Sequence, residues 1–285
     1  YQTLNTLALS FNRAGGSFQS NVDGALAVRL IQGWVAEIGV SCAQLAQKGL
    51  TGPANFLGGV YGYAHLYGRG RIQADSFVSD LGSRWALLDT CFKKYPSCGL
   101  TQAATELIVR ALAENKLEYE SVETIEIRIP PYAHRLVGHP FQRGENPRVN
   151  AQFSIQFCVA NALVRRSSSL SHFVPDRISD PQIEAMLSRI VVCPDEKVHE
   201  RGHTAVDLSI CTKNRQNLLL QIDHPPGMPH TALTDEEHLG RFKDCLNYAS
   251  PEHGNGRCLE LAAWIDAIDS KKSIEQLIYL MRRMS

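Results

Sequence analysis

The chain has 285 residues, with 29 basic and 29 acidic side chains and no formal net charge at pH 7. Hydrophobic residues make up 44% and charged residues 20%, as in an ordinary globular protein that is long enough to bury a core. The balanced charge argues against partners such as nucleic acid or an anionic membrane surface, and no apolar run reaches the about 20 residues of a membrane-spanning helix.

The first 70 residues read mainly as helix. Apolar residues recur at helical spacing through residues 1–11 and again through 25–48, where Gly49 fits the C-terminal end of the helix. The glycine- and tyrosine-rich stretch 58–68 predicts closely packed helices rather than a ligand-binding loop. We therefore expect a helical region before the chain changes character near residue 85.

The middle of the chain mixes strand and helix patterns. The clearest is a half-buried strand at 122–129, where three isoleucines alternate with Glu126 and Arg128. The other expected strands are 85–92, 190–194, 204–212 and 217–223, and the expected helices are 101–114, 150–164 and 181–190. This order indicates an α+β region rather than a regular β-α alternation.

The chain becomes helical again after a proline-rich connection at 224–231. Thr234 followed by three acidic residues is a strong signal for a helix start, and the expected helices are 234–249, 255–268 and 273–284. The sequence thus predicts a mainly α fold with an α+β insertion. The expected domains are a helical domain in two parts, 1–84 and 232–285, and an α+β domain at 85–231.

The eight cysteines are scattered and form no C-x-x-C pair. Zinc-ribbon and iron–sulfur spacings are therefore missing, and we interpret most of the cysteines as free thiols in a reducing compartment. The chain contains no G-x-S-x-G, P-loop or G-x-G-x-x-G motif.

Residues 199–203 read H-E-R-G-H and match the H-E-x-x-H pattern of zinc proteases. That chemistry needs both histidines on one face of a helix. Gly202 lies inside the pattern and a strand pattern follows at once, so we expect a solvated connection and no metal site. A zinc hydrolase on His199 and His203 is the alternative, and metal in the purified protein would support it.

The most informative feature is a set of stretches in a fixed order. Residues 92–98 read F-K-K-Y-P-S-C, residues 33–53 form a glycine- and alanine-rich helical stretch ending in G-L-T-G-P, and residues 147–163 contain F-S-I-Q-F. Together they resemble the MmgE/PrpD family, which carries F-K-x-Y-P-x-C between helices of these two kinds. The proline-rich segment 225–229 and the acidic helix start at 234–237 also resemble that family, so the resemblance covers essentially the whole chain.

The resemblance implies a helical domain plus a smaller α+β lid domain, with the active site between them and a homodimer as the assembly. The family's activities are dehydration of 2-methylcitrate, decarboxylation of cis-aconitate and epimerisation of iminodisuccinate. The chain is thus expected to be a lyase (dehydratase or decarboxylase) or an isomerase, with a small carboxylate substrate and no metal or organic cofactor.

The resemblance also bears on the start of the chain and on its compartment. The family's N-terminal part, which carries an acidic motif with Asp and His, is not among these residues. We therefore expect Tyr1 to be an interior cut or a processed end. The expected location is cytoplasmic, or the mitochondrial matrix if a transit peptide was removed with the missing part.

Lys93 matches the family's catalytic lysine in this resemblance. Loss of a proton or CO₂ next to a carboxylate builds negative charge, which a fixed cation and a positioned acid or base would stabilise. The alternative is a surface lysine at a strand end, since Lys94 follows directly. The expected substrate-binding residues are Arg29, Tyr95, Ser97, Cys98, Gln102, Ser154 and Phe157, of which Cys98 reads equally well as a small core residue.

Four positions depart from the family pattern in chemically meaningful ways. Val28 and Ile31 stand where relatives commonly carry lysine and histidine, and Gln102 and Phe157 replace a histidine and a tyrosine. Aliphatic side chains cannot transfer protons and phenylalanine cannot donate a hydrogen bond. Only Arg29 is left to replace the lost cation, so the sequence favours a less charged, alkylated substrate, or a non-catalytic dimerising relative.

Overall fold

The computed structural model describes residues 1–15, 17, 19–69, 71–72, 78–114, 116–251 and 254–282. The chain divides into two compact units, Tyr1–Asp89 and Thr90–Ser285. Mainly helical structure with one small sheet agrees with the expected fold class. The role of the α+β part as a lid and the domain bounds at 84/85 and 231/232 remain predictions.

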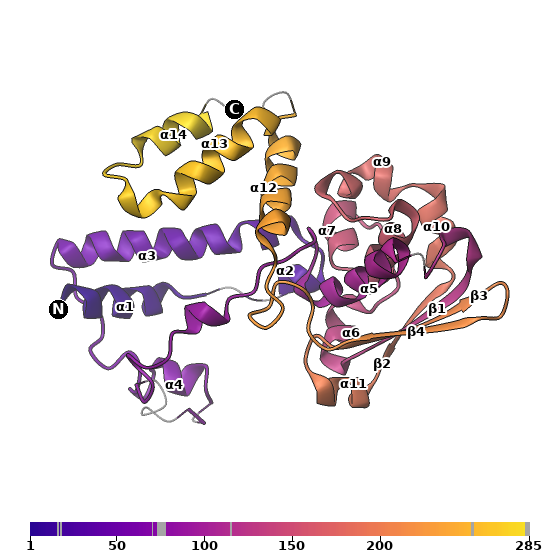
Figure 1. The fold of residues 1–285 in the computed structure, drawn as a ribbon. Coiled ribbons are helices and arrows are strands. Elements are labelled where there is room, and N and C mark those ends of the chain that lie inside the picture. The colour runs from indigo at the N-terminus through magenta and orange to yellow at the C-terminus, as the bar shows by residue number, and fades with distance from the viewer. Residues whose placement is uncertain are drawn as a thin grey trace. The chain divides into compact units, whose positions relative to one another are not determined.

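The Tyr1–Asp89 unit is built around two helices, α1 (Gln2–Arg13) and α3 (Ile31–Gln47), which lie side by side (Figure 1). The short elements around them are α2 (Gln19–Val22), the 3₁₀ turn η1 (Leu26–Arg29) and α4 (Tyr63–Leu66). The expected helix at 25–48 is therefore a 3₁₀ turn followed by α3. Only Cys42 and Ala46 of α3 are buried, so most of its apolar face is exposed.

The Thr90–Ser285 unit contains a four-stranded mixed sheet in the order β2-β1-β3-β4. Strands β1 (Val122–Ile129) and β2 (Ile190–Pro194) are parallel, whereas β3 (Val206–Thr212) and β4 (Asn217–Ile222) add antiparallel to β1. The expected strand at 122–129 is confirmed with its bounds. Its isoleucines are buried and its charged residues face the other way, as the alternation predicts.

Two buried helices cover the inner face of this sheet. The helix α5 (Gln102–Ala113) packs on β3 and β4, and α8 (Ile155–Arg165) packs on β2 and on α5 (Figure 1). The helices α6 (Pro131–Val137), α7 (Pro147–Gln152), α9 (Pro175–Ile178), α10 (Pro181–Leu187) and α11 (Glu196–Arg201) complete this part. One apolar core joins the sheet to α5, α6, α7, α8, α9 and α10.

Two further expected elements differ from the structure. The strand predicted at 85–92 is wrong, because the chain forms the 3₁₀ turn η3 (Ala86–Asp89) with Leu87 82% exposed. An apolar run forms a strand only where a neighbouring strand pairs with its backbone hydrogen-bonding groups, and the periodicity of the sequence does not show whether such a neighbour exists. The helix predicted at 150–164 breaks into α7 and α8, because the Ser154 hydroxyl accepts from the Phe157 N–H and starts a new helix.

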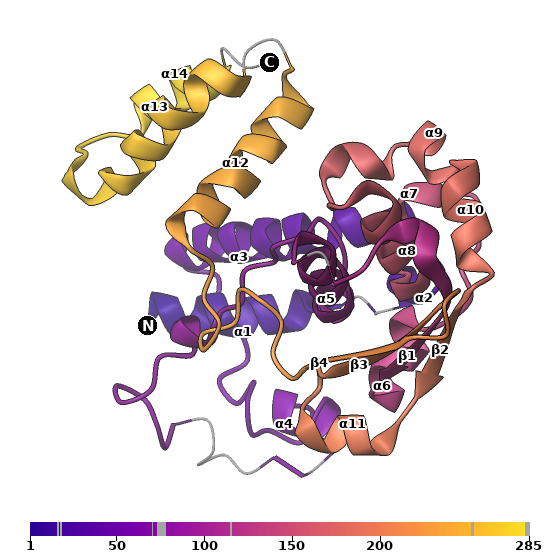
Figure 2. The ribbon, with the colours of Figure 1, turned by 45° about the vertical axis from the view of Figure 1, so that its right-hand side comes forward.

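Three helices end the unit: α12 (Asp235–Ala249), α13 (Gly254–Asp266) and α14 (Glu275–Arg282). Figure 2 shows α13 and α14 running beside each other. Helix α12 starts where the sequence predicts, and there Thr234 and Glu237 cap it reciprocally. A small second core of Leu261, Trp264 and Leu280 holds these helices together. Within the described ranges, none of the helices combines the length and apolar character needed to cross a membrane.

Candidate functional site

The 92–98 turn lies between η3 and the start of α5, against the 224–231 connection. The Phe92 N–H donates to the Gly227 carbonyl at 2.8 Å. Gly227 has φ +90°, and a Cβ there would lie 1.7 Å from the Phe92 carbonyl oxygen. Only glycine fits this close approach, so the turn is fixed against the chain that leads into α12.

A closed hydrogen-bond network holds the second half of the turn. The Gln102 side chain accepts from the Tyr95 N–H at 2.8 Å and donates to the Tyr95 carbonyl at 3.0 Å. The hydroxyls of Ser97 and Thr101 are 2.7 Å apart. The Gln152 amide donates to the Pro96 carbonyl at 2.6 Å. Gln102 is only 2% exposed, so it acts here as the internal brace of the turn.

Lys94 lies between two carboxylates from different helices. Its Nζ is 3.0 Å from Glu106 of α5 and 2.8 Å from Glu237 of α12. The Tyr95 hydroxyl donates to the same Glu106 oxygen at 2.6 Å. Burial alone lowers the pKa of Lys94, but the hydrogen bonds that it donates to Glu237 and Glu106 outweigh burial and raise that pKa above its ordinary value. The Lys94 hydrogen bond in turn lowers the pKa of Glu237, so the bridge holds both groups charged.

Lys93 differs from its neighbour in both exposure and pairing. Its side chain is exposed, and no carboxylate of the described residues forms an ion pair with it. It lies near the Cys98 thiol, whose pKa burial raises while the Lys93 charge opposes that rise. The two adjacent lysines therefore differ: Lys94 is charged and ion-paired with two carboxylates, whereas the Lys93 side chain is exposed.

The structure brings Tyr95, Ser97, Cys98 and Gln102 together around this turn. Burial raises the pKa of the Tyr95 phenol, and Glu106 beside it adds to that rise, so the phenol stays protonated. The thiol of the fully buried Cys158 lies next to Ser97 and Thr101, and burial raises its pKa to about 12. The polar groups of the turn therefore satisfy one another within the protein.

The remaining expected site residues lie elsewhere. Ser154 caps α8, and Phe157 is fully buried between Phe141 and Phe173, with ring centroids 4.9 and 5.8 Å away. Arg29 is exposed at the end of η1, in the Tyr1–Asp89 unit. Substrate binding by these residues and by the turn residues remains a prediction.

Sequence reasoning missed the bridge of Lys94, Glu106 and Glu237. The sequence places Glu106 inside the expected helix 101–114 and Glu237 in the acidic start of the expected helix 234–249. In the structure the α5 N-cap has no side-chain hydrogen bond, and Glu106 binds Lys94 and Tyr95. Glu237 caps α12 with one oxygen and binds Lys94 with the other. The one signal in the sequence is the pair of adjacent lysines, Lys93 and Lys94, because one of two neighbouring lysines can form an ion pair with a carboxylate of the fold.

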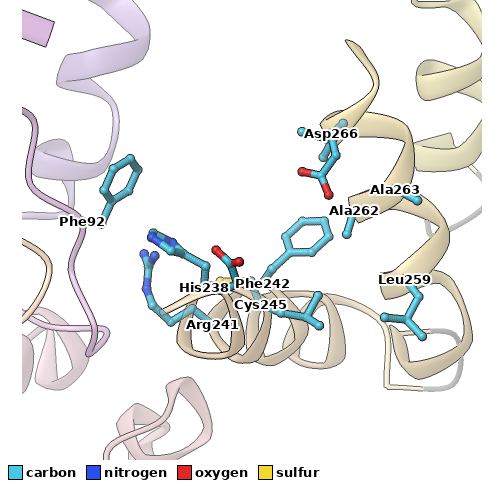
Figure 3. Close-up of a pocket in the computed structure, with 12 residues that line it drawn as sticks. Phe92, His238, Arg241, Phe242, Cys245, Leu259, Ala262, Ala263 and Asp266 are labelled. Atoms are coloured by element: carbon cyan, nitrogen blue, oxygen red, sulfur yellow. The ribbon is translucent and has the colours of Figure 1, made fainter. Parts of the chain in front are cut away.

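An open groove of about 970 Å³ runs along α12 and α13 (Figure 3). Phe92 borders it, with its ring edge-on to His238 at a centroid distance of 5.0 Å. Phe242 and Leu259 give it an apolar floor, and Arg241 lies at its polar rim. The groove lies beside the 92–98 turn, since Phe92 belongs to both.

The H-E-R-G-H segment lies partly on a helix, which corrects the expectation of a plain connection. His199 belongs to α11, which ends at Gly202 with φ +148°, and His203 follows that end. The two rings lie 5.3 Å apart. A search of the described residues finds no group of three or more His, Cys, Asp or Glu side chains that could hold a metal, so zinc gains no support from geometry.

Comparison with known proteins adds one match. Residues 95–264, more than half of the chain, match the MmgE/PrpD C-terminal domain. No curated protein matches the chain. The matched residues run from Tyr95 of the turn through the sheet and α12 to Trp264 of α13.

Proposed function

The chain belongs to the MmgE/PrpD family, and on that premise we propose that it is a lyase, a dehydratase or decarboxylase, for a small citrate- or aconitate-like acid. Lys93 is the proposed catalytic residue. The observation that carries the proposal is the contrast between Lys93, which is exposed and forms no ion pair with a carboxylate of the described residues, and Lys94, which is ion-paired with two. An ammonium group without an internal carboxylate partner is available to pair with a carboxylate of the substrate.

The chemistry explains why one free cation matters. Dehydration removes a proton from the carbon beside a carboxylate and expels the hydroxyl group as water. Decarboxylation releases CO₂ and leaves an electron pair on carbon, which then takes up a proton. Negative charge grows on the carbon framework in both reactions, and a fixed ammonium group near the substrate carboxylates stabilises that charge.

The surroundings of the turn favour an alkylated substrate. Phe92, next to Lys93 in the chain, borders the groove with its apolar floor of Phe242 and Leu259. Separately, in the Tyr1–Asp89 unit, Val28 and Ile31 are apolar at positions where relatives commonly carry charge or a histidine. Each of the two observations by itself favours a substrate with one alkyl group and fewer charges than a tricarboxylate.

Two alternatives share the same fold. An isomerase of the same family would begin with the same proton removal, so Lys93 would serve it equally well. A non-catalytic relative that dimerises is favoured by Gln102 and Phe157, because both are enclosed by protein partners. We also propose a homodimer, no cofactor, and a reducing compartment, cytoplasmic or mitochondrial matrix.

The test is turnover by the purified full-length protein. Alkylcitrates, citrate and cis-aconitate are each incubated with the protein, and products are followed by NMR together with CO₂ release. The proposal expects turnover of at least one acid, abolished in Lys93→Met and unchanged in Lys213→Met, which alters an exposed lysine at the end of β3. A protein that converts none of them, or a Lys93→Met variant as active as the parent, contradicts the proposal.

A further inference from the structure

We propose that Lys94 is a positioning residue: its bridge to Glu106 and Glu237 holds the turn so that Lys93 alone faces the substrate. This inference rests on the proposed function of Lys93. It assigns a role to a side chain that the sequence resemblance leaves variable, and to two carboxylates on helices far apart in the sequence.

The bridge joins two helices through one ammonium group. Glu106 lies in α5, within the core of the α+β part, and is only 7% exposed. Glu237 lies in the first turn of α12, where one oxygen accepts the Thr234 N–H at 2.9 Å and the other binds Lys94 at 2.8 Å. The capping box fixes the Glu237 rotamer, so the position of Lys94 is defined from both sides.

Lys93 is flanked by fixed residues on both sides. Before it, Phe92 is held by its N–H bond to Gly227 and by its edge-on contact with His238. After it come the Lys94 bridge and the Tyr95 backbone, both of whose polar groups Gln102 holds. The backbone on either side of Lys93 therefore has little freedom, while its side chain remains open.

The charges of the bridge also separate the two lysines by function. Two carboxylates face one ammonium group, so the bridge carries surplus negative charge at Glu106 and Glu237. An anionic substrate is repelled there and attracted to Lys93, whose charge no carboxylate of the described chain offsets. Without the bridge, Lys94 becomes a second, mobile cation beside Lys93 and competes for the same carboxylate.

Two kinetic variants and two controls test this inference in the full chain. Glu237→Gln keeps an oxygen for the Thr234 cap but removes the charge that holds Lys94, and Lys94→Met removes the ammonium group. Glu236→Gln changes an exposed acid of the same helix turn without a bridge. Lys94→Arg keeps a cation that can reach both carboxylates.

The expected kinetic result is a loss in kcat/KM of about 10-fold or more for Glu237→Gln and Lys94→Met, because displacement of a reacting group by about 1 Å can cost about 100-fold in rate. Thermal unfolding of both variants should show, relative to Glu236→Gln, only the small loss of stability expected for a partly exposed ion pair. This loss is too little to unfold the protein in the assay, and Lys94→Arg should recover most of the activity. Wild-type kinetics in both disrupted variants would overturn the inference and leave the proposed function intact.

A second readout does not need turnover. Brief acetylation followed by peptide mass spectrometry measures the amine reactivity of Lys93 and Lys94 separately. We expect a reactive Lys93 and a protected Lys94 in the parent, and in Glu237→Gln both exposure of Lys94 and a changed rate at Lys93. If the parent converts no acid, the proposed function fails, but the labelling still tests the positioning role of Lys94. An acetylation rate of Lys93 that stays unchanged in Glu237→Gln, although Lys94 has become reactive, overturns that role.

Discussion

Two sets of helices in this molecule differ in how they use their apolar residues. In the Thr90–Ser285 unit, α8 buries eight of its 11 residues and α5 nine of its 12. In the Tyr1–Asp89 unit, α3 buries two of its 17 residues, although its sequence is just as apolar. Apolar residues at helical spacing therefore predict a helix, but they do not predict how much of its apolar face is buried. That depends on which other segments of the fold pack against it.

The same contrast separates the two groups of expected site residues. Most of those in the 92–98 turn and in α8 rest on a packed core, where Gln102 holds the Tyr95 backbone and Ser154 accepts from the Phe157 N–H. Arg29 lies in the unit whose main helix is largely exposed. Substitutions in the first group should cost folding stability, whereas substitutions in the second should change little except function.

The largest expected effect is from Phe157→Ala. Its ring is fully buried between Phe141 and Phe173, so truncation leaves a cavity and should lower the free energy of unfolding by about 3–5 kcal/mol. Trp34→Ala on α3, at a side chain that is 51% exposed, should change it by less than about 1 kcal/mol. Urea unfolding followed by circular dichroism measures the loss for each variant. Equal losses in the free energy of unfolding would contradict the difference in packing between α8 and α3.

A smaller loss is expected from Gln102→Leu. This change leaves the buried Tyr95 N–H and carbonyl without their partner, which should lower the free energy of unfolding by about 1–3 kcal/mol. Gln44→Leu on the exposed face of α3 is the matched control and should be close to neutral. If the two glutamine variants unfold at the same urea concentration, Gln102 is not the brace described above.

These predictions also show what the sequence could reveal. The alternation in 122–129 identified β1 with its bounds, since apolar and polar residues alternate along a strand that is buried on one face. The apolar run 85–92 carried no such alternation, and no strand pairs with it in the residues described. Lys93 was recognisable from its motif, whereas the bridge from Lys94 to Glu237 depends on a contact between distant segments, which no local pattern encodes.

A modest, pH-dependent effect is expected at the bridge. The pKa of Glu237 is lowered from its ordinary value of 4.5, so its ion pair with Lys94 contributes stability above that pH and loses it as the pH falls through the lowered pKa. The contribution of a partly exposed pair is about 0.2–1 kcal/mol. Urea unfolding at pH 7 and at a series of pH values below 4.5 should therefore show Glu237→Gln less stable than Glu236→Gln at pH 7, with a difference that shrinks as the pH falls. A difference that stays constant while the pH is lowered would rule out the ion pair as its source.

The role of Lys93 is tested most directly by calorimetric titration of cis-aconitate and an alkylcitrate into the full-length protein and two lysine variants. We expect the parent and Lys213→Met to bind with the same Kd, and Lys93→Met to bind with a Kd raised about 10-fold or more, equivalent to about 1.4 kcal/mol. Lys93→Met protein that binds these acids as tightly as the parent would contradict the role of Lys93 as the free cation of the site.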